Sequence, residues 1–336
     1  MTIDNGLREP SSVQADQARG RTAETPTEIP GKGWKDVFAR VRKESKDDGV
    51  SLLSAGVAFY GLLAFVPGLV ALVSLYGLVA KPSDVQRQVS SSLSAAPKEV
   101  RGLVTSQLQS IVNSAGKGAV LGVIFGTLLA LWSASSGIGH LIEAVNRAYD
   151  EQETRGFVKR KAIALMFTIG AILFVLVAFG LVTILPALLA KSGLGTAARV
   201  VVGALRWIVL LGGMIVGLAV LYRFGPDRDD PRWRWVTPGA VVAAVAWIIG
   251  SLLFSLYTAN FAKYNETYGS LGAVVIMLLW LFLTAAVVIM GAEINAELER
   301  QTTRDTTVGG DQPMGQRSAL AADTVGETAD QVSQSK

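Results

Sequence analysis

One uncharged run near the C-terminus constrains the fold more than any other feature. From Gly269 to Ala292 there are 24 consecutive residues without a charged side chain. At about 1.5 Å per residue, a helix of this length is roughly 36 Å long, which is enough to cross a hydrocarbon core of about 30 Å. The run follows Tyr268 and ends at Glu293. It therefore predicts a transmembrane helix.

Five other stretches resemble this one. Hydrophobic residues make up 50% of the chain, and charged residues only 17%. This composition predicts an all-α polytopic membrane protein with six transmembrane helices. Pro67, inside the first span, either kinks that helix or divides it into two pieces. The expected spans are residues 50–80, 119–144, 162–190, 203–224, 236–262 and 269–292.

The parts between and around the spans are polar. Residues 1–33 and 301–336 have little apolar periodicity and are expected to be disordered cytoplasmic tails around the 34–300 membrane domain. Residues 34–48 form an amphipathic pattern, which predicts an interfacial helix or, alternatively, a simple soluble lead-in helix. Residues 81–117 predict an extracytoplasmic amphipathic segment.

The distribution of Lys and Arg near the span ends predicts the orientation. Sixteen of them lie on the side that carries both termini, against eight on the other side. Cytoplasmic segments are enriched in these residues, so we expect both termini in the cytoplasm and the protein in the cytoplasmic membrane. Six spans are an even number of crossings, which agrees with this orientation.

The second span contains the most polar face. Steps of three and four residues place Ser133, Ser136, His140, Glu143 and Arg147 on one side of the helix, with Glu143 and Arg147 spaced for an ion pair. One interpretation is a structural cap at headgroup level, and the other is a polar pathway through the bundle. Glu293 completes the candidate pathway and is expected to pair with Arg147 or Arg223.

Other patterns concern packing and chemistry. Gly122 with Gly126, and Gly213 with Gly217, are small-residue pairs that predict close helix approach. The chain has no Cys and one His, and it carries no phosphate-binding loop, HExxH or G-x-S-x-G motif. We therefore expect no catalytic residue, cofactor or metal. The acidic runs at 150–153 and 227–230 read as solvated turns, and a net charge of +4 gives little support for a nucleic-acid partner.

Several motifs together resemble the YihY/virulence factor BrkB family. They include residues 47–78, LYRFGPDR at 221–228, NETYGSLGAV at 265–274 and GAEINAEL at 291–298. The resemblance implies a bacterial inner-membrane protein of about six spans without an established activity, connected with envelope functions and with lipid or solute export. It also implies that the ribonuclease BN label of some members is a misassignment. The family-motif positions are Asp48, Tyr60, Pro67, Asn146, Arg155, Pro226, Pro238, Gly239, Asn265, Tyr268, Gly269, Gly272, Glu293 and Asn295.

These observations support two hypotheses about function. The first is a transporter-like or flippase-like protein that moves a lipid or amphiphile along a groove between spans two, five and six. The second is a non-transporting scaffold in envelope integrity that recruits partners through its polar ends. A membrane nuclease is disfavoured. Membrane lipids are the expected partners, whereas the substrate, the coupling ion and a homo-oligomeric state stay open.

Overall fold

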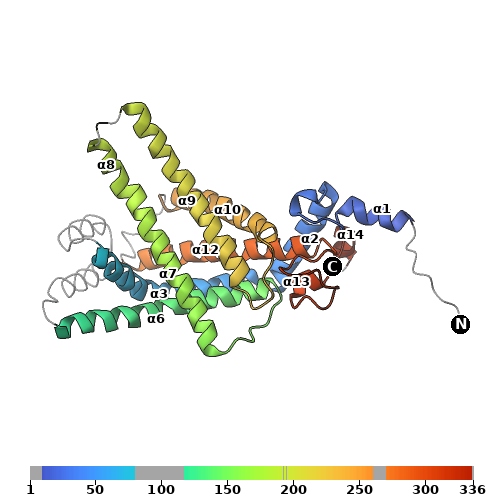
Figure 1. The fold of residues 1–336 in the computed structure, drawn as a ribbon, viewed down its shortest axis with the longest axis horizontal. Coiled ribbons are helices and arrows are strands. Elements are labelled where there is room, and N and C mark those ends of the chain that lie inside the picture. The colour runs from blue at the N-terminus through green and yellow to red at the C-terminus, as the bar shows by residue number, and fades with distance from the viewer. Residues whose placement is uncertain (1–9, 80–116, 192, 194, 260–269, 335–336) are drawn as a thin grey trace.

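The structure, a computed structural model, describes residues 10–79, 117–191, 193, 195–259 and 270–334. Its regular elements are helices, and one isolated antiparallel bridge joins Pro231 and Thr307. Six helices are long and apolar enough to cross a membrane, which confirms the predicted fold class. They are α3 (Val50–Val79), α6 (Lys117–Ala148), α7 (Phe157–Phe179, whose span continues to Ile184), α9 (Thr196–Phe224), α10 (Trp233–Ala259) and α12 (Ser270–Glu299) (Figure 1).

Some expectations fall outside the described residues. The predicted amphipathic segment 81–117 does so except for Lys117, as do the motif positions Asn265, Tyr268 and Gly269. Among the described positions, Gly272 lies in the first turn of α12. The structure answers the question about Pro67, which lies within an unbroken α3. Proline therefore does not divide the first span.

Proline has a clearer effect in the third span. Helix α7 is followed by a π-helical turn, η2 (Gly180–Ile184), and then by the short helix α8 (Leu185–Lys191). Pro186 cannot donate a backbone hydrogen bond, and its ring crowds the carbonyl of the preceding turn. A wider turn just before the proline relieves this crowding, so the span continues with a local irregularity.

The spans form a closely packed group with two diverging members. Helix α3 packs against α6 and α12, α10 packs against α12 and α9, and α7 packs against α6. Figure 1 shows α7 and α9 running obliquely to α3, α6 and α12 and diverging from them towards α8. Large apolar side chains such as Leu173, Val201 and Ile208 are exposed on these two helices. Lipid contact explains such a surface, because a soluble protein rarely exposes large apolar patches.

The polar ends of the chain meet at one end of the bundle, which we call the base. It comprises residues 10–48, which include α2 (Gly31–Asp47), the loops 149–156 and 225–232, the ends of α6 and α12 beside them, and residues 300–334 (Figure 1). Helix α2 is the predicted amphipathic helix. Its apolar residues Val37 and Val41 are buried in a cluster with Trp235 and Leu298. Much of its apolar face is thus covered by the protein, while Phe38 is exposed.

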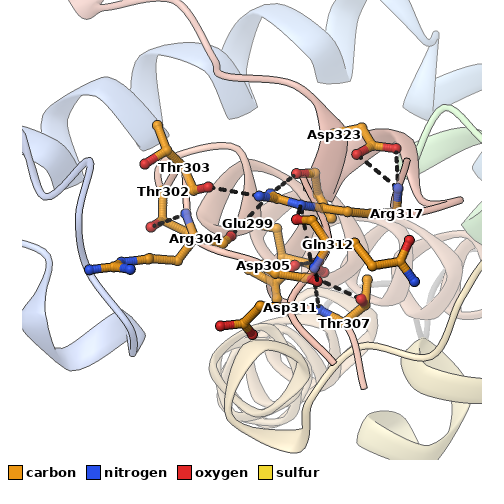
Figure 2. A network of polar contacts seen from close by, with 12 residues as sticks. Glu299, Thr302, Thr303, Arg304, Asp305, Thr307, Asp311, Gln312, Arg317 and Asp323 are labelled. Carbon is orange, nitrogen blue, oxygen red and sulfur yellow. Dashed lines mark hydrogen bonds and ion pairs between the residues drawn. The ribbon is translucent and has the colours of Figure 1, made fainter. Parts of the chain in front are cut away.

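The terminal segments differ from the expectation of disordered tails. Helices α1 (Pro10–Arg19), η1 (Pro26–Glu28), α13 (Leu320–Asp323) and α14 (Ala329–Gln334) belong to the base. Buried Arg317 donates hydrogen bonds to the carbonyls of Thr303 and Gln312, which Figure 2 shows, and also to that of Ala322. The prediction rested on low apolar content, whereas hydrogen bonds from buried side chains to the backbone hold this segment. Residues 1–9 and 335–336 lie outside the described residues.

Candidate functional site

A cavity of about 200 Å³ lies between α6 and α7, close to the base. Because Phe157 begins α7, the cavity is at the end of the third span, where lipid headgroups would lie. Both helices and the loop between them contribute polar side chains. The polar and charged lining residues are Ser135, Ser136, His140 and Glu143 from α6, Glu153 and Arg155 from the loop, and Arg160 and Lys161 from α7.

Three of the six predicted pathway residues line this cavity. The His140 ring stacks on Tyr60 of α3 with a centroid distance of 3.6 Å, and its Nδ1 is 3.5 Å from Glu143 Oε2. The Ser136 hydroxyl donates to the carbonyl of Ser133 at 2.6 Å, which leaves its lone pairs for another donor. Stacking on Tyr60 fixes the imidazole, a role for this motif position that helical spacing could not reveal.

Cations on the α7 side face this polar stripe. Lys161 Nζ donates to the carbonyl of Trp132 at 2.7 Å and lies 4.6 Å from the centroid of the same indole. This uses one of its three N–H donors. Arg160 is exposed and forms no ion pair with another described residue. The cavity thus has two cations with free hydrogen-bonding capacity.

A network between two loops holds the lower wall of the cavity. Arg155 donates to Glu153 at 2.6 and 2.7 Å and to the carbonyl of Gly225 at 2.8 Å. Asn146 links the same loops by donating to Glu153 and accepting from the backbone N–H of Asp227 at 2.7 Å. Pro226 lies between two of these contacts. The acidic runs predicted as solvated turns therefore include structural carboxylates.

The electrostatics of Asp227 follow from this network. Burial raises its pKa, but hydrogen bonds from Thr154 and the charge of Arg155 outweigh burial, so the pKa lies below its ordinary value. Arg155 is paired with two carboxylates, Glu153 at 2.6 Å and Asp227 at 3.6 Å, which more than balance its charge. We conclude that Arg155 shapes the cavity and contributes little free positive charge to it.

Arg147 and Glu293, the other two charged residues of the predicted pathway, do not line this cavity. Arg147 does not pair with Glu143, because its Nε donates to Asp48 at 3.2 Å. Arg223 lies over the ring of Trp233 at 4.6 Å and 3.8 Å from Asp230. Neither expected partner is therefore bound to Glu293, whose Oε1 is buried without a hydrogen-bond partner among the described residues.

Close helix approach occurs at the crossing of α10 and α12. A Cβ on Gly239 would lie 2.1 Å from the carbonyl oxygen of Gly291. Asn295 accepts from the Gly239 N–H at 2.7 Å and donates to the Val236 carbonyl at 3.0 Å, next to Pro238. The motif positions Pro238, Gly239 and Asn295 thus form one structural unit. By contrast, a Cβ on Gly126 or Gly217 would meet no described atom within 4 Å.

The expected groove between spans two, five and six is not where the structure has its polar cavity. The face shared by α10 and α12 has a hollow of about 190 Å³ with an apolar lining that includes Ala243, Ala246 and Met290. The polar cavity instead uses α7, whose polar residues at its first turn were not singled out as candidates. Among the described residues, no group of three or more His, Asp or Glu side chains is placed to hold a metal ion.

Six membrane-crossing helices with a polar cavity at a span end define a multi-pass α-helical membrane protein. Residues 41–314 match the family described as Virulence factor BrkB, and the chain belongs to this family. It is 32% identical over 256 residues to the ribonuclease-like protein YfkH of Bacillus subtilis (strain 168), covering 74% of this chain and 90% of the relative. It is 27% identical over 273 residues to a UPF0761 membrane protein of Alteromonas mediterranea, covering 79% and 88%. No solved structure matches the chain.

Proposed function

We propose that this protein is transporter-like or flippase-like and binds the headgroup of a phosphate-bearing amphiphile in the cavity between α6 and α7. The observation that carries the proposal is the placement of Arg160 and Lys161 opposite Ser136 and Glu143 at a span end. Basic pockets between transmembrane helices bind phosphorylated headgroups, because cations and hydroxyls replace the water around the phosphate.

The charges also favour one class of headgroup. Arg155 is paired with both Glu153 and Asp227, so the groups left for a ligand are the cations Arg160 and Lys161 and the Glu143 carboxylate. A headgroup with both a phosphate and an amine satisfies all three groups. Phosphatidylethanolamine has this chemistry, whereas a headgroup with phosphate alone would be repelled by Glu143. The acyl chains would lie along the apolar, exposed surface where α7 diverges from α6 (Figure 1).

The test uses purified protein in vesicles of phosphatidylethanolamine and phosphatidylcholine that contain a fluorescent phosphatidylethanolamine. Movement between leaflets is followed by quenching the outer-leaflet dye, and bound lipid is measured by mass spectrometry. We expect Arg160→Gln combined with Lys161→Gln to lose lipid binding at least tenfold, because charged hydrogen bonds contribute about 1.5–3 kcal/mol each. The matched control is Lys159→Gln, a cation of the same turn outside the cavity lining. Equal binding by all variants would contradict the proposal.

The scaffold hypothesis remains the alternative, and the base is what favours it. If the protein binds lipid but moves none, the scaffold is the better description. Deleting residues 301–336 is a poor test, because Arg40 donates to Gln301 and to the carbonyl of Glu327. The deletion would damage the base itself. The absence of enzyme activity, of cofactors and of a nucleic-acid partner stays a prediction, as does the cytoplasmic location of both termini.

A further inference from the structure

A buried carboxyl group at the base has no cation to pair with. The Glu293 side chain is 1% exposed, and its Oε1 receives no hydrogen bond from a described residue. The carboxyl of Asp48, at the C-cap of α2, is itself 8% exposed and lies close enough to Glu293 for the two charges to repel each other. Two ionised carboxylates cannot donate to each other, so a hydrogen bond between these two groups needs a proton.

The cations of the base are already used by other carboxylates. Arg147 from α6 donates to Asp48, and Arg300 after α12 binds Glu297 at 2.6 Å and also Asp150. Arg40 from α2 binds Glu297 as well. The charged groups that act on Glu293 from the elements around it are Glu44, Asp48, Asp150 and Glu297. Three cations thus face five carboxyl groups, and neither Glu44 nor Glu293 forms an ion pair with a described residue. Of these two, Glu293 is the fully buried one.

Holding a buried Glu293 in its ionised form beside Asp48 would be costly, because neither desolvation nor repulsion is offset by a partner. A protonated Glu293 can instead donate its O–H to the Asp48 carboxylate, which Arg147 stabilises from the other side. We propose that Asp48 and Glu293 form a proton-binding pair that holds one proton between their carboxyl groups at neutral pH. Release of this proton leaves two adjacent carboxylates and one proton in solvent.

The location of the pair gives its titration a structural effect. Asp48 is followed by Gly49, with φ +64°, and then by Val50, the first residue of α3. Repulsion after proton release acts between this α2–α3 junction and α12. Burial and the charge of Asp150 raise the pKa of Asp48 against the opposing effect of Arg147, which is the direction that proton sharing requires. This inference does not depend on lipid binding, since neither residue lines the α6/α7 cavity.

The sign of the pH dependence follows from linkage. A pair that takes up a proton on folding stabilises the folded state at low pH and loses that contribution as the pH rises above the ordinary carboxyl value of about 4. For the full-length protein in detergent, we expect the thermal midpoint to fall between pH 6 and pH 9. Glu293→Gln keeps the shape and a donor for Asp48, so its midpoint should depend much less on pH. The control Glu24→Gln, at an exposed carboxylate outside both sites, should behave like the wild type.

Infrared spectroscopy tests the proton directly. The carbonyl stretch of a protonated carboxylic acid is separate from that of a carboxylate. We expect the wild type at pH 7 to show a protonated-acid band that Glu293→Gln removes and Glu24→Gln retains. A band that persists in Glu293→Gln, or a wild type without this band, would overturn the proposal. A midpoint that rises with NaCl in the wild type and not in Glu293→Gln would also overturn it, in favour of a bound cation.

Discussion

Single arginine residues hold much of the base together by bonding to groups that are distant in sequence. The side chains of Arg228 and Glu299 are fully buried and form an ion pair with an N–O distance of 2.7 Å. The guanidinium lies 4.9 Å from the Tyr149 ring centroid, and the Thr306 hydroxyl donates to Glu299 at 2.6 Å. A buried pair of this kind costs desolvation energy for both ions. Removing one ion therefore destabilises the fold mainly because the other ion stays buried without a partner.

We therefore predict that Arg228→Leu lowers the free energy of unfolding by about 3–5 kcal/mol, because Glu299 stays buried without its cation. The double variant with Glu299→Leu removes both charges and should recover part of the loss. Denaturant unfolding in detergent, followed by tryptophan fluorescence, measures both. If the double variant is no more stable than Arg228→Leu alone, the uncompensated charge is not the cause.

At the scale of elements, the crossing of α10 and α12 depends on two glycines and one amide. Gly239 and Gly291 allow the backbones to touch, and the hydroxyl of Tyr222 donates to the Val288 carbonyl beside them at 2.8 Å. The small-residue patterns that sequence singled out, such as Gly213 with Gly217, lie on a different helix. Periodicity shows which face of a helix is small, but it does not show which neighbour will use that face.

We predict that Gly239→Ala lowers the thermal midpoint clearly, whereas Gly217→Ala has little effect. The added methyl group at 239 would overlap the Gly291 carbonyl and force the two helices apart, and overpacking usually costs about 1–3 kcal/mol. At 217 the same methyl group meets no described atom within 4 Å. A thermal scan of the two variants in one detergent makes the comparison. Equal midpoints would mean that the close contact at Gly239 does not determine the thermal stability of the protein.

At the scale of the whole molecule, both terminal segments are part of one folded base. Arg21 donates to the carbonyls of Arg300 and Gly326, and Arg19 binds Asp36 at 2.7 Å. Figure 2 shows that side chains also bind the backbone within the C-terminal segment, where the Asp305 carboxylate accepts hydrogen bonds from two backbone N–H groups. The two Arg21 bonds join residues 279 and 305 positions apart in the chain, so the base forms when the six spans have brought both ends together.

Hydrogen exchange tests this arrangement. The backbone N–H groups of Thr303, Val308 and Gly326 donate to Arg21, Asp230 and Arg300. We predict slow exchange for peptides that contain these amides, because their hydrogen bonds break only when the base unfolds. Arg317→Ala should speed their exchange, whereas its exposed neighbour Gln316→Ala should not. Exchange within seconds across residues 301–334 in the wild type would restore the expectation of a disordered tail.

The candidate site was predictable in part. Helical spacing placed Ser136, His140 and Glu143 on one face, and the structure brings them to one cavity. The same spacing assigned Arg147 to Glu143, but Asp48, 99 residues earlier in the chain, is nearer in the fold. Pairing along a helix contributes a few tenths of a kcal/mol, so a partner from another element easily displaces it.

The amino-acid sequence was enough to predict a membrane protein, its helical class and the approximate positions of the six spans. The length and polarity of a run are local properties, and they decide whether a helix is stable in the hydrocarbon core. Tertiary structure alone decided which polar groups meet. It put Glu293 beside Asp48, Arg228 on Glu299 and the α7 cations across from the α6 stripe. Such partners are set by how distant helices pack, and the energy that selects them depends on distances of a few ångströms that no local pattern records.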